Sequence, residues 1–297
     1  MKTLHTWRRV DTAARAIGLA AIPRYGPLCR GMEAVWSLPP VRGMLVRKLR
    51  KKLPRHPLFA SGASPDPQAL ARLFMGRVGS SWRLAALDLC PEQDVRDAVR
   101  LVGVERFEKA RDQGQGVLLV GAHYGAAHFL SVALDRLGIP NAVVAKFPEQ
   151  AARRVVEHLD LIPLSREDPV RPLLLARERL KAGGTVLITG DGPHGKRVRA
   201  PFLGIEAGFP QGFATLATAT RAPLLPTFAI PGPGGRITIE FLEAIECGES
   251  DLARERRVHE IVQRFARILE RKWLEDPALV WWQGPELRPP LPWRASA

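Results

Sequence analysis

The first candidate for chemistry is a histidine in the loop 121–125, whose sequence is GAHYG. An apolar run at 117–120 precedes the loop and a helical pattern at 126–137 follows it, so His123 is predicted to lie between a buried strand and a helix. A neutral imidazole at such a position is a suitable general base near pH 7. A single loop histidine is more often incidental than catalytic, and the loop alone leaves both interpretations open.

A second candidate is the segment 190–204, which follows the apolar run at 185–189 and is rich in glycine and basic residues. Turn-rich, electropositive loops can hold an anionic group such as phosphate, although the same composition is typical of a solvated surface turn. Its ionisable residues include Asp191, Lys196, Arg197 and Arg199. The segment therefore indicates either an anion clamp or an ordinary turn.

Both loops are embedded in an alternation of strand and helix patterns that begins near residue 115. Strands are predicted at 117–120, 142–145, 161–164, 185–189, 224–230 and 236–241. Helices are predicted at 126–137, 149–159, 170–182, 209–220 and 251–274, and a further helical pattern at 92–100 precedes them. This alternation predicts an α/β fold with a mostly parallel central sheet and helices on both faces. In such sheets functional groups collect at the carboxyl ends of strands, where both loops are expected.

The N-terminal fifth of the chain differs from the rest in charge. Residues 1–60 hold 13 Lys and Arg against two acidic residues, so they carry +11 of the formal charge of +14. Apolar stripes at 4–21 and in a basic helix predicted at 41–52 favour an amphipathic helical segment on an anionic membrane surface. Packing of these stripes on the main domain is the alternative, and nucleic acid is disfavoured because no binding motif accompanies the charge. We thus expect a membrane-associating segment over 1–60 and an α/β domain over 61–297.

Several classes of protein are disfavoured by what the sequence lacks. No apolar stretch predicts a spanning helix or a signal peptide, so a peripheral protein on the cytoplasmic side is expected. The three cysteines, Cys29, Cys90 and Cys247, are widely spaced, which argues for a reducing compartment and against a structural zinc site. His123 and His128 are five residues apart, an offset that turns them away from each other on a helix, and no metal or redox cofactor is implied.

The ordered series of motifs over about 100–297 resembles the bacterial lipid A late acyltransferases of lauroyl or myristoyl type, within the wider lysophospholipid acyltransferase-like proteins. The matching stretches are 117–125, 189–195, 200–204, 212–219, 222–226 and the closing 277–283. The resemblance implies transfer of a fatty acyl group from acyl carrier protein or coenzyme A to a hydroxyl of a membrane lipid or glycolipid. It also implies a lipid A-like acceptor and a place at the cytoplasmic face of the inner membrane.

The resemblance also implies roles for individual residues. His123 matches the histidine of the family's His-x4-Asp/Glu signature, whereas His128 stands where the family has its carboxylate. His123 would remove the hydroxyl proton, N–H groups near Gly125 or a basic side chain would hold the oxyanion, and four basic side chains would contact phosphates. These are Lys146, Lys196, Arg197 and Arg199. Because a carboxylate normally orients the base, either another acid such as Asp191 takes that role or activity is weakened.

Other functions remain open at this point. The missing carboxylate at position 128 is compatible with a non-catalytic lipid-binding or assembly protein, and the acceptor of an active enzyme could be an amine or a specialised metabolite. Replacing His128 by glutamate is predicted to preserve or raise turnover if that position is a vacant carboxylate slot. The same change is predicted to lower turnover if the site is built around a different acid.

Overall fold

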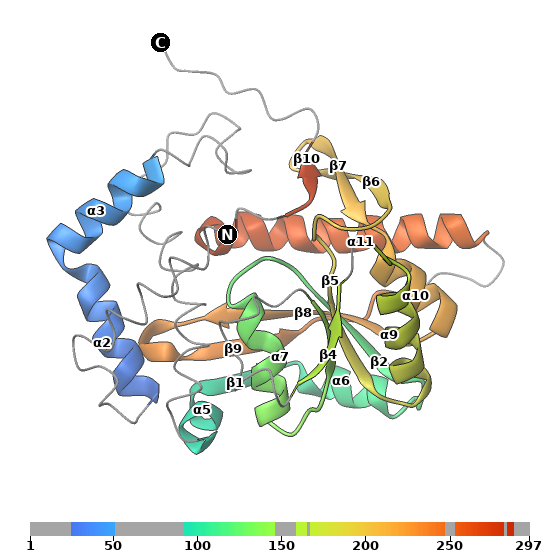
Figure 1. Cartoon of the computed structure of the whole chain (residues 1–297), viewed down its shortest axis with the longest axis horizontal. Coiled ribbons are helices and arrows are strands. Elements are labelled where there is room, and N and C mark those ends of the chain that lie inside the picture. Colours follow the sequence, from blue (N-terminus) through green and yellow to red (C-terminus); the bar gives the residue numbers. More distant parts are fainter. Residues whose placement is uncertain are drawn as a thin grey trace, which may run out of the picture.

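The computed structural model describes residues 25–50, 92–145, 159–164, 167–246, 253–281 and 284–287. Its centre is a seven-stranded sheet with the strand order β1-β9-β8-β2-β5-β3-β4 (Figure 1). The strands are β1 (Val99–Val102), β2 (Val117–Gly121), β3 (Ala142–Ala145), β4 (Asp160–Pro163), β5 (Thr185–Thr189), β8 (Leu224–Pro231) and β9 (Ile237–Phe241). The predicted α/β class is therefore confirmed.

Most of this sheet is parallel, as predicted. The five strands β8, β2, β5, β3 and β4 run in one direction. The exception is β9, which pairs antiparallel with β8, and β1 then pairs parallel with β9. The connection between β8 and β9 is a short turn rich in glycine and proline, and a connection of that length can join only antiparallel strands.

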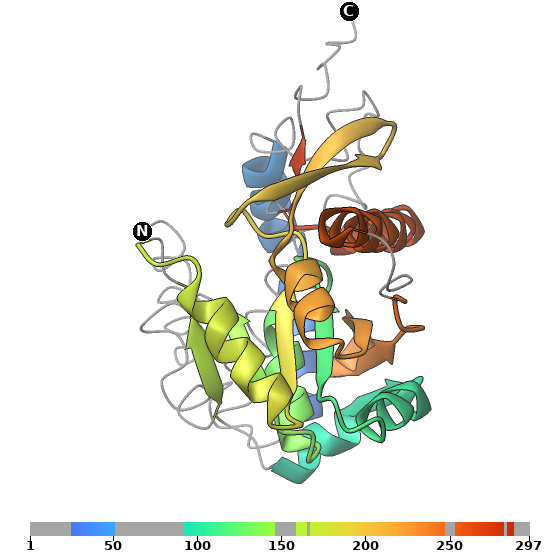
Figure 2. The same cartoon turned by 90° about the vertical axis from the view of Figure 1, so that its right-hand side faces the viewer.

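Helices cover both faces of the sheet because the side chains of each strand alternate between two apolar clusters. On β2, Leu118 and Val120 face one cluster and Val117 and Leu119 face the other. The first cluster contains α9 (Arg171–Lys181), α10 (Gly212–Thr220) and α11 (Arg254–Glu275). The second contains α2 (Tyr25–Ser37), α5 (Glu92–Ala98), α6 (Val104–Arg111) and α7 (Ala127–Arg136). Figure 2 shows α11 nearly end-on, close to the small sheet described next.

A second, three-stranded sheet was not predicted. It has the order β10-β7-β6, with antiparallel pairing between β6 (Arg197–Phe202), β7 (Ile205–Pro210) and β10 (Glu286–Leu287). The segment 197–202 was expected to be loop, and residues 209–210 were expected to begin a helix. Because exposed charged side chains, glycine and proline interrupt these strands, they lack the continuous apolar run of a central strand.

The N-terminal helix α2 packs on the α/β domain. Tyr25 and Leu28 are buried, and the Tyr25 N–H donates to a carboxylate oxygen of Asp94 at 3.2 Å. The Glu33 carboxylate accepts from the N–H of Gly234, in the turn between β8 and β9, at 2.9 and 3.0 Å. α2 was not predicted as a helix, and its apolar side faces the domain core.

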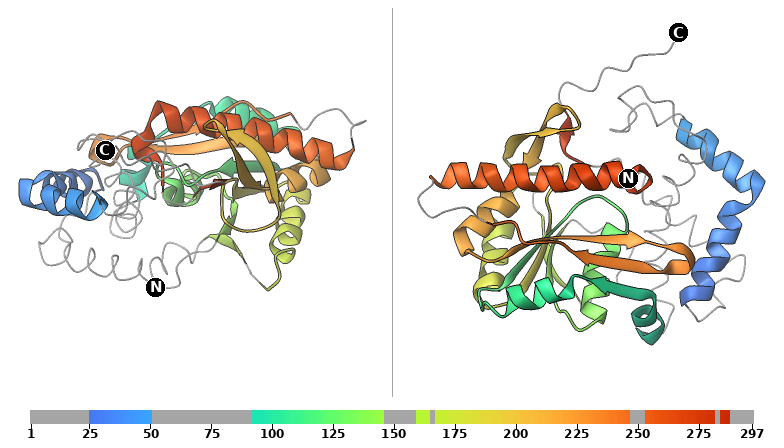
Figure 3. Two further views of the ribbon diagram at one scale, coloured as in Figure 1. Left: turned by 90° about the horizontal axis from the view of Figure 1, so that it is seen from above. Right: turned by 180° about the vertical axis from the view of Figure 1, so that it is seen from behind.

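The helix predicted at 41–52 corresponds to α3 (Pro39–Arg50), which lies beyond α2 at the margin of the molecule (Figure 3). Leu38 and Met44 are exposed, and so are the basic side chains of Arg42 and Arg47. The stripe predicted at 4–21 and residues 51–60 lie outside the described residues, so the boundary near residue 60 stays a prediction.

Within the described ranges, no helix combines the length and apolar character needed to cross a bilayer.

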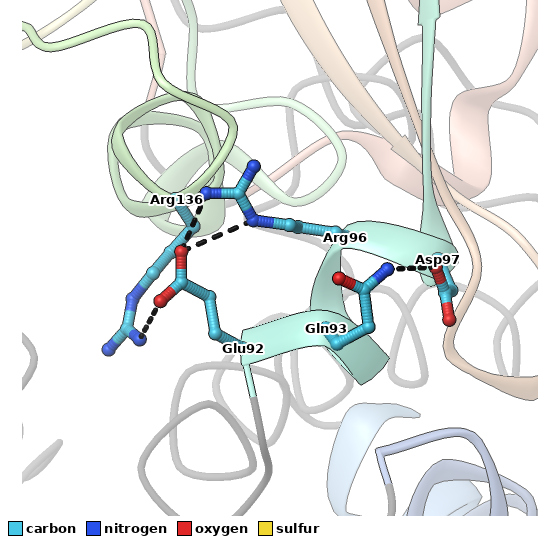
Figure 4. Close-up of polar contacts among 5 residues, drawn as sticks. All are labelled: Glu92, Gln93, Arg96, Asp97 and Arg136. Carbon is cyan, nitrogen blue, oxygen red and sulfur yellow. Dashed lines mark hydrogen bonds and ion pairs between the residues drawn. The ribbon is translucent and has the colours of Figure 1, made fainter.

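The helices α5 and α7 are joined by a surface cluster of charged and amide side chains (Figure 4). Glu92 accepts from Arg96 at 2.7 Å within α5 and lies 3.9 Å from Arg136 in the last turn of α7. Gln93 donates to Asp97 at 2.8 Å one turn further along α5. The cluster ties α5 to the end of α7 that is remote from the loop at 121–126.

Three further points compare the predicted elements with the structure. Residues 92–100 were predicted to be helical, but α5 ends at Ala98 and β1 begins at Val99. α6 was not predicted, because its polar sequence offers only a short apolar stripe. The helix predicted at 149–159 lies outside the described residues apart from Leu159, as do Cys90, Cys247 and Lys146. Cys29 is buried as a free thiol.

Candidate active site

The two candidate loops lie side by side because β2 and β5 are paired neighbours. Gly121, the last residue of β2, is in register with Thr189, the last residue of β5. The Gly190 N–H then donates to the Gly121 carbonyl at 2.8 Å, which continues the parallel ladder beyond both strands. His123 lies two residues past Gly121, and Asp191 lies two residues past Thr189. Both are therefore at the carboxyl edge, where an α/β sheet carries its functional groups.

His123 and Asp191 form a close polar contact at this edge. The Nδ1 atom of His123 lies 2.8 Å from Oδ1 of Asp191. The backbone N–H of His123 donates to the same carboxylate, at 2.9 Å to Oδ2 and 3.1 Å to Oδ1. The Asp191 side chain is fully buried, whereas 14% of the His123 side chain is exposed. The carboxylate is thus enclosed by protein, while the ring keeps an accessible edge.

This contact determines which ring nitrogen of His123 can act as a base. A carboxylate only accepts hydrogen bonds, so the neutral ring carries its proton on Nδ1 and presents the lone pair of Nε2. Burial lowers the pKa of His123, but the charge of Asp191 and its hydrogen bond outweigh burial and raise that pKa above its ordinary value. Asp191 therefore fixes the tautomer and stabilises the imidazolium that forms when Nε2 takes a proton.

Glycines allow the two loops to approach the rest of the molecule closely. Gly125 has φ of +60°, and a Cβ atom there would lie 2.3 Å from the Ala229 carbonyl oxygen. A Cβ atom on Gly190 would lie 2.5 Å from the ring of Phe265 in α11. Real Cβ contacts are not this short, so neither loop can follow its path with a larger residue at these positions.

His128 lies in the first turn of α7 and contacts an aromatic side chain. Its ring centroid is 4.8 Å from that of Trp281, in an edge-on arrangement, and Trp281 is also 5.8 Å from the His123 ring. The structure therefore brings His123, His128 and Asp191 into one neighbourhood, and the carboxylate on Nδ1 of His123 is that of Asp191. Trp281 lies in the matching stretch 277–283 but was not among the predicted site residues, because that stretch is far along the chain from His123 and gives it no role.

Among the N–H groups near Gly125 that were predicted to hold the oxyanion, that of Gly125 itself already has an acceptor in the structure. The Gly125 N–H donates to the Leu279 carbonyl at 2.8 Å, and the Ala126 N–H donates to the Ala229 carbonyl at 2.7 Å. Both groups hold the loop in place. Any backbone donor to an oxyanion must come from elsewhere at this edge.

The predicted phosphate contacts fall at different places. The Arg197 guanidinium is half-buried and contacts the Gly208 carbonyl at 2.8 Å and the Glu286 carboxylate at 3.3 Å. These contacts join β6, β7 and β10. Lys196 and Arg199 are exposed, and no hydrogen bond or ion pair within the described ranges joins either to His123. Lys146 lies outside the described residues, so all four contacts stay predictions.

Comparison with known proteins identifies the family. Residues 66–283 match the family described as bacterial lipid A biosynthesis acyltransferase. No curated protein sequence matches the chain. Among solved structures, the 1-acyl-sn-glycerophosphate (LPA) acyltransferase PlsC from Thermotoga maritima is similar at 18% identity with a TM-score of 0.36, over 77% of this chain and 97% of that one. Because the family match spans well over half of the residues, the chain belongs to the bacterial lipid A biosynthesis acyltransferase family and is an acyltransferase.

Proposed function

We propose that the protein transfers a fatty acyl group from an acyl carrier protein or coenzyme A thioester to a hydroxyl group of a membrane lipid or glycolipid, with a lipid A-like acceptor, and that His123 is the general base. The observation that carries this proposal is the contact between Nδ1 of His123 and the buried Asp191 carboxylate at 2.8 Å. It supplies an oriented base with an accessible ring edge. It also removes the reason to prefer a non-catalytic protein, since a carboxylate is available to His123 without position 128.

The proposed reaction proceeds by direct attack of the acceptor. Nε2 of His123 takes the proton of the acceptor hydroxyl as its oxygen attacks the thioester carbonyl carbon. The resulting tetrahedral intermediate collapses when the C–S bond breaks, and the proton on Nε2 passes to the departing sulfur. The products are an ester and a free thiol, and the ring returns to its starting state. Asp191 stays ionised throughout and stabilises the transient imidazolium.

The oxyanion of the intermediate needs a donor beside the ring of His123. Within the described residues, the Gly192 N–H donates to no backbone carbonyl. A Cβ atom on Gly192 would lie 3.8 Å from Cε1 of His123, so this residue borders the ring edge between the two nitrogens. The Gly192 N–H therefore replaces the Gly125 N–H in the proposed mechanism.

Membrane attachment is the second part of the proposal. The apolar side of α2 packs on the domain, so α2 is not available to a bilayer. We therefore assign the membrane contact to α3. α3 exposes the basic Arg42 and Arg47 together with Met44. Basic side chains near an anionic surface contribute about 1 kcal/mol each, and salt weakens this attraction. We place the protein as a peripheral protein at the cytoplasmic face of the inner membrane.

The acyl-transfer proposal is tested with labelled donors. Purified protein is incubated with acyl carrier protein or coenzyme A thioesters carrying a labelled chain, together with a lipid extract containing hydroxylated glycolipids. Transfer of label to a lipid hydroxyl, lost in His123→Gln, is the expected result. Label appearing on an amine, or equal transfer by His123→Gln, would contradict the assigned acceptor or the assigned base.

The membrane proposal is tested by sedimentation with vesicles. Replacement of Arg42 and Arg47 by serine is expected to weaken binding to anionic vesicles at low salt. Replacement of two exposed arginines of a different helix, Arg254 and Arg271 of α11, serves as the control for net charge. Equal weakening in both double variants would exclude α3 as the contact surface.

A further inference from the structure

The segment Leu279–Trp281, which follows α11, runs alongside the loop that carries His123. The Leu279 carbonyl accepts from the Gly125 N–H at 2.8 Å, and the Trp281 N–H donates to the His123 carbonyl at 3.1 Å. Between these contacts, Tyr124 and Val280 form an antiparallel bridge. The loop after β2 is thus paired, residue by residue, with a segment more than 150 positions away in the sequence.

The side chain of Trp281 adds contacts that backbone pairing alone does not provide. Its indole N–H donates to the Gly125 carbonyl at 2.9 Å in a buried hydrogen bond. Its ring lies 5.8 Å from the ring of His123 and 4.8 Å from the ring of His128, measured between centroids. The Trp281 side chain therefore contacts the end of the loop at Gly125 and lies beside the rings of His123 and His128.

We propose that Trp281 is a positioning residue that holds the His123 ring in place for proton transfer, an inference that rests on the proposed role of His123 as base. Asp191 restrains the ring through Nδ1 and the backbone N–H. Trp281 restrains it from the carbonyl side of the loop and by ring contact. On the other side of the loop, the Ala126 N–H donates to the Ala229 carbonyl at 2.7 Å, which holds the loop against β8. The indole of Trp281 thus restrains the loop on the side opposite Asp191.

The chain offers a matched control for the loss of a buried indole. Trp273 in α11 is fully buried, and its indole nitrogen has no acceptor among the described residues. Its ring packs edge-on against Phe202, away from both histidines. Trp273→Phe therefore removes the same atoms as Trp281→Phe without removing a hydrogen bond, so the pair separates positioning from packing.

The experiment measures turnover and the state of His123 in the same full-length proteins. kcat and KM for acyl transfer are compared among wild type, Trp281→Phe and Trp273→Phe. Proton NMR follows the downfield signal of the Nδ1 proton shared with Asp191, identified by its absence in His123→Gln. For Trp281→Phe we expect kcat to fall roughly tenfold to hundredfold with KM unchanged, as for a displaced catalytic group, and the Nδ1 signal to shift or broaden. Trp273→Phe is expected to lower thermal stability and leave kcat and the signal unchanged.

Two results would overturn the positioning role: an Nδ1 signal in Trp281→Phe identical to wild type, or the same change in both tryptophan variants. Failure of the proposed function is recognised separately, because it would be an absence of transfer by the wild type with every donor. In that case the NMR signal still decides whether Trp281 holds the His123 ring.

Discussion

The loop after β2 and the helix α5 each place a basic group beside a carboxylate, but in opposite surroundings. Asp191 lies 2.8 Å from His123 and its side chain is fully buried. Glu92 lies 2.7 Å from Arg96, and 48% of its side chain is exposed. Water screens the second pair, so its short distance carries little energy, whereas the buried pair acts through a low dielectric. Burial, rather than distance, makes one contact a candidate for chemistry and the other a surface feature.

The largest expected effect follows from removing the base. We expect His123→Ala to lower acyl transfer by about 10²–10⁴-fold, since Nε2 of His123 is the atom that takes the hydroxyl proton in the proposed mechanism. The fold should be kept, because His123 lies in a loop and not in either apolar cluster. His259→Ala, an exposed histidine of α11, is the control. Turnover in His123→Ala equal to that of the control would remove His123 from the mechanism.

The second effect comes from keeping the shape of Asp191 but not its charge. Asp191→Asn is expected to reduce turnover by at least about tenfold, because an amide no longer selects the Nδ1-protonated tautomer. Activity requires unprotonated Nε2, so it rises with pH through the pKa of His123, which Asp191 raises above its ordinary value.

In Asp191→Asn burial acts alone on the pKa of His123, and the rising limb of the pH profile should move to lower pH. Rates measured from pH 5 to 9 test this shift. Asp160→Asn, an exposed aspartate at the sheet edge, should leave the profile in place. A limb that stays fixed in Asp191→Asn would show that the titration belongs to another group.

A third, smaller effect tests whether the loop path is as constrained as the glycine contacts indicate. Gly125 and Gly114 both have positive φ. A Cβ atom on Gly125 would clash with the Ala229 carbonyl oxygen, whereas a Cβ atom on Gly114 would meet no atom within 4 Å. Gly114→Ala should lose only about 1–2 kcal/mol of unfolding free energy from the left-handed backbone. Gly125→Ala should lose more and also lower turnover. Equal losses in thermal unfolding would contradict the close approach at Gly125.

A fourth effect concerns His128 and its contact with Trp281. With Asp191 already on Nδ1 of His123, a glutamate at position 128 has no vacant slot to fill and removes an aromatic pair of about 0.5–1.5 kcal/mol. We expect His128→Glu to lower turnover several-fold and His128→Phe to keep more of it. A rise in turnover in His128→Glu would instead support the vacant-slot interpretation drawn from the sequence resemblance.

The smallest effect is expected at the exposed cluster. The hydrogen bond and charge of Arg96 lower the pKa of Glu92, but solvent surrounds the pair. Glu92→Gln should therefore leave turnover unchanged and move the melting temperature little. A loss of activity comparable to that of Asp191→Asn would break the contrast between the buried and exposed pairs.

The sequence predicts the central strands well because they are short, continuous apolar runs. β2, β3 and β5 were predicted within about one residue, since strands buried on both faces need no polar alternation. The strands β6 and β7 were missed because charged residues, glycine and proline interrupt their sequences, so neither is a continuous apolar run. The antiparallel pairing of β9 follows from its short connection to β8, a constraint of loop length rather than of the apolar pattern.

The site was predictable in part, and the physical reason is distance along the chain. His123 follows from its place after a buried strand, and Asp191 was named because a second strand end carries it. Their contact depends on the pairing of Gly121 with Thr189, which single strands do not reveal. The stretch 277–283 resembles the family, but no role for Trp281 followed from it, because its contacts with the loop arise only when the segment after α11 folds back onto that loop.

The pairing of Leu279–Trp281 with the His123 loop also bears on biosynthesis. During translation of this chain, His123 is made first, Asp191 next and Trp281, whose indole restrains the His123 loop, last. A nascent chain stalled anywhere before residue 281 would expose the strands β2 and β5 without a finished site. The order of translation therefore places the last contacts of the His123 loop near the end of synthesis.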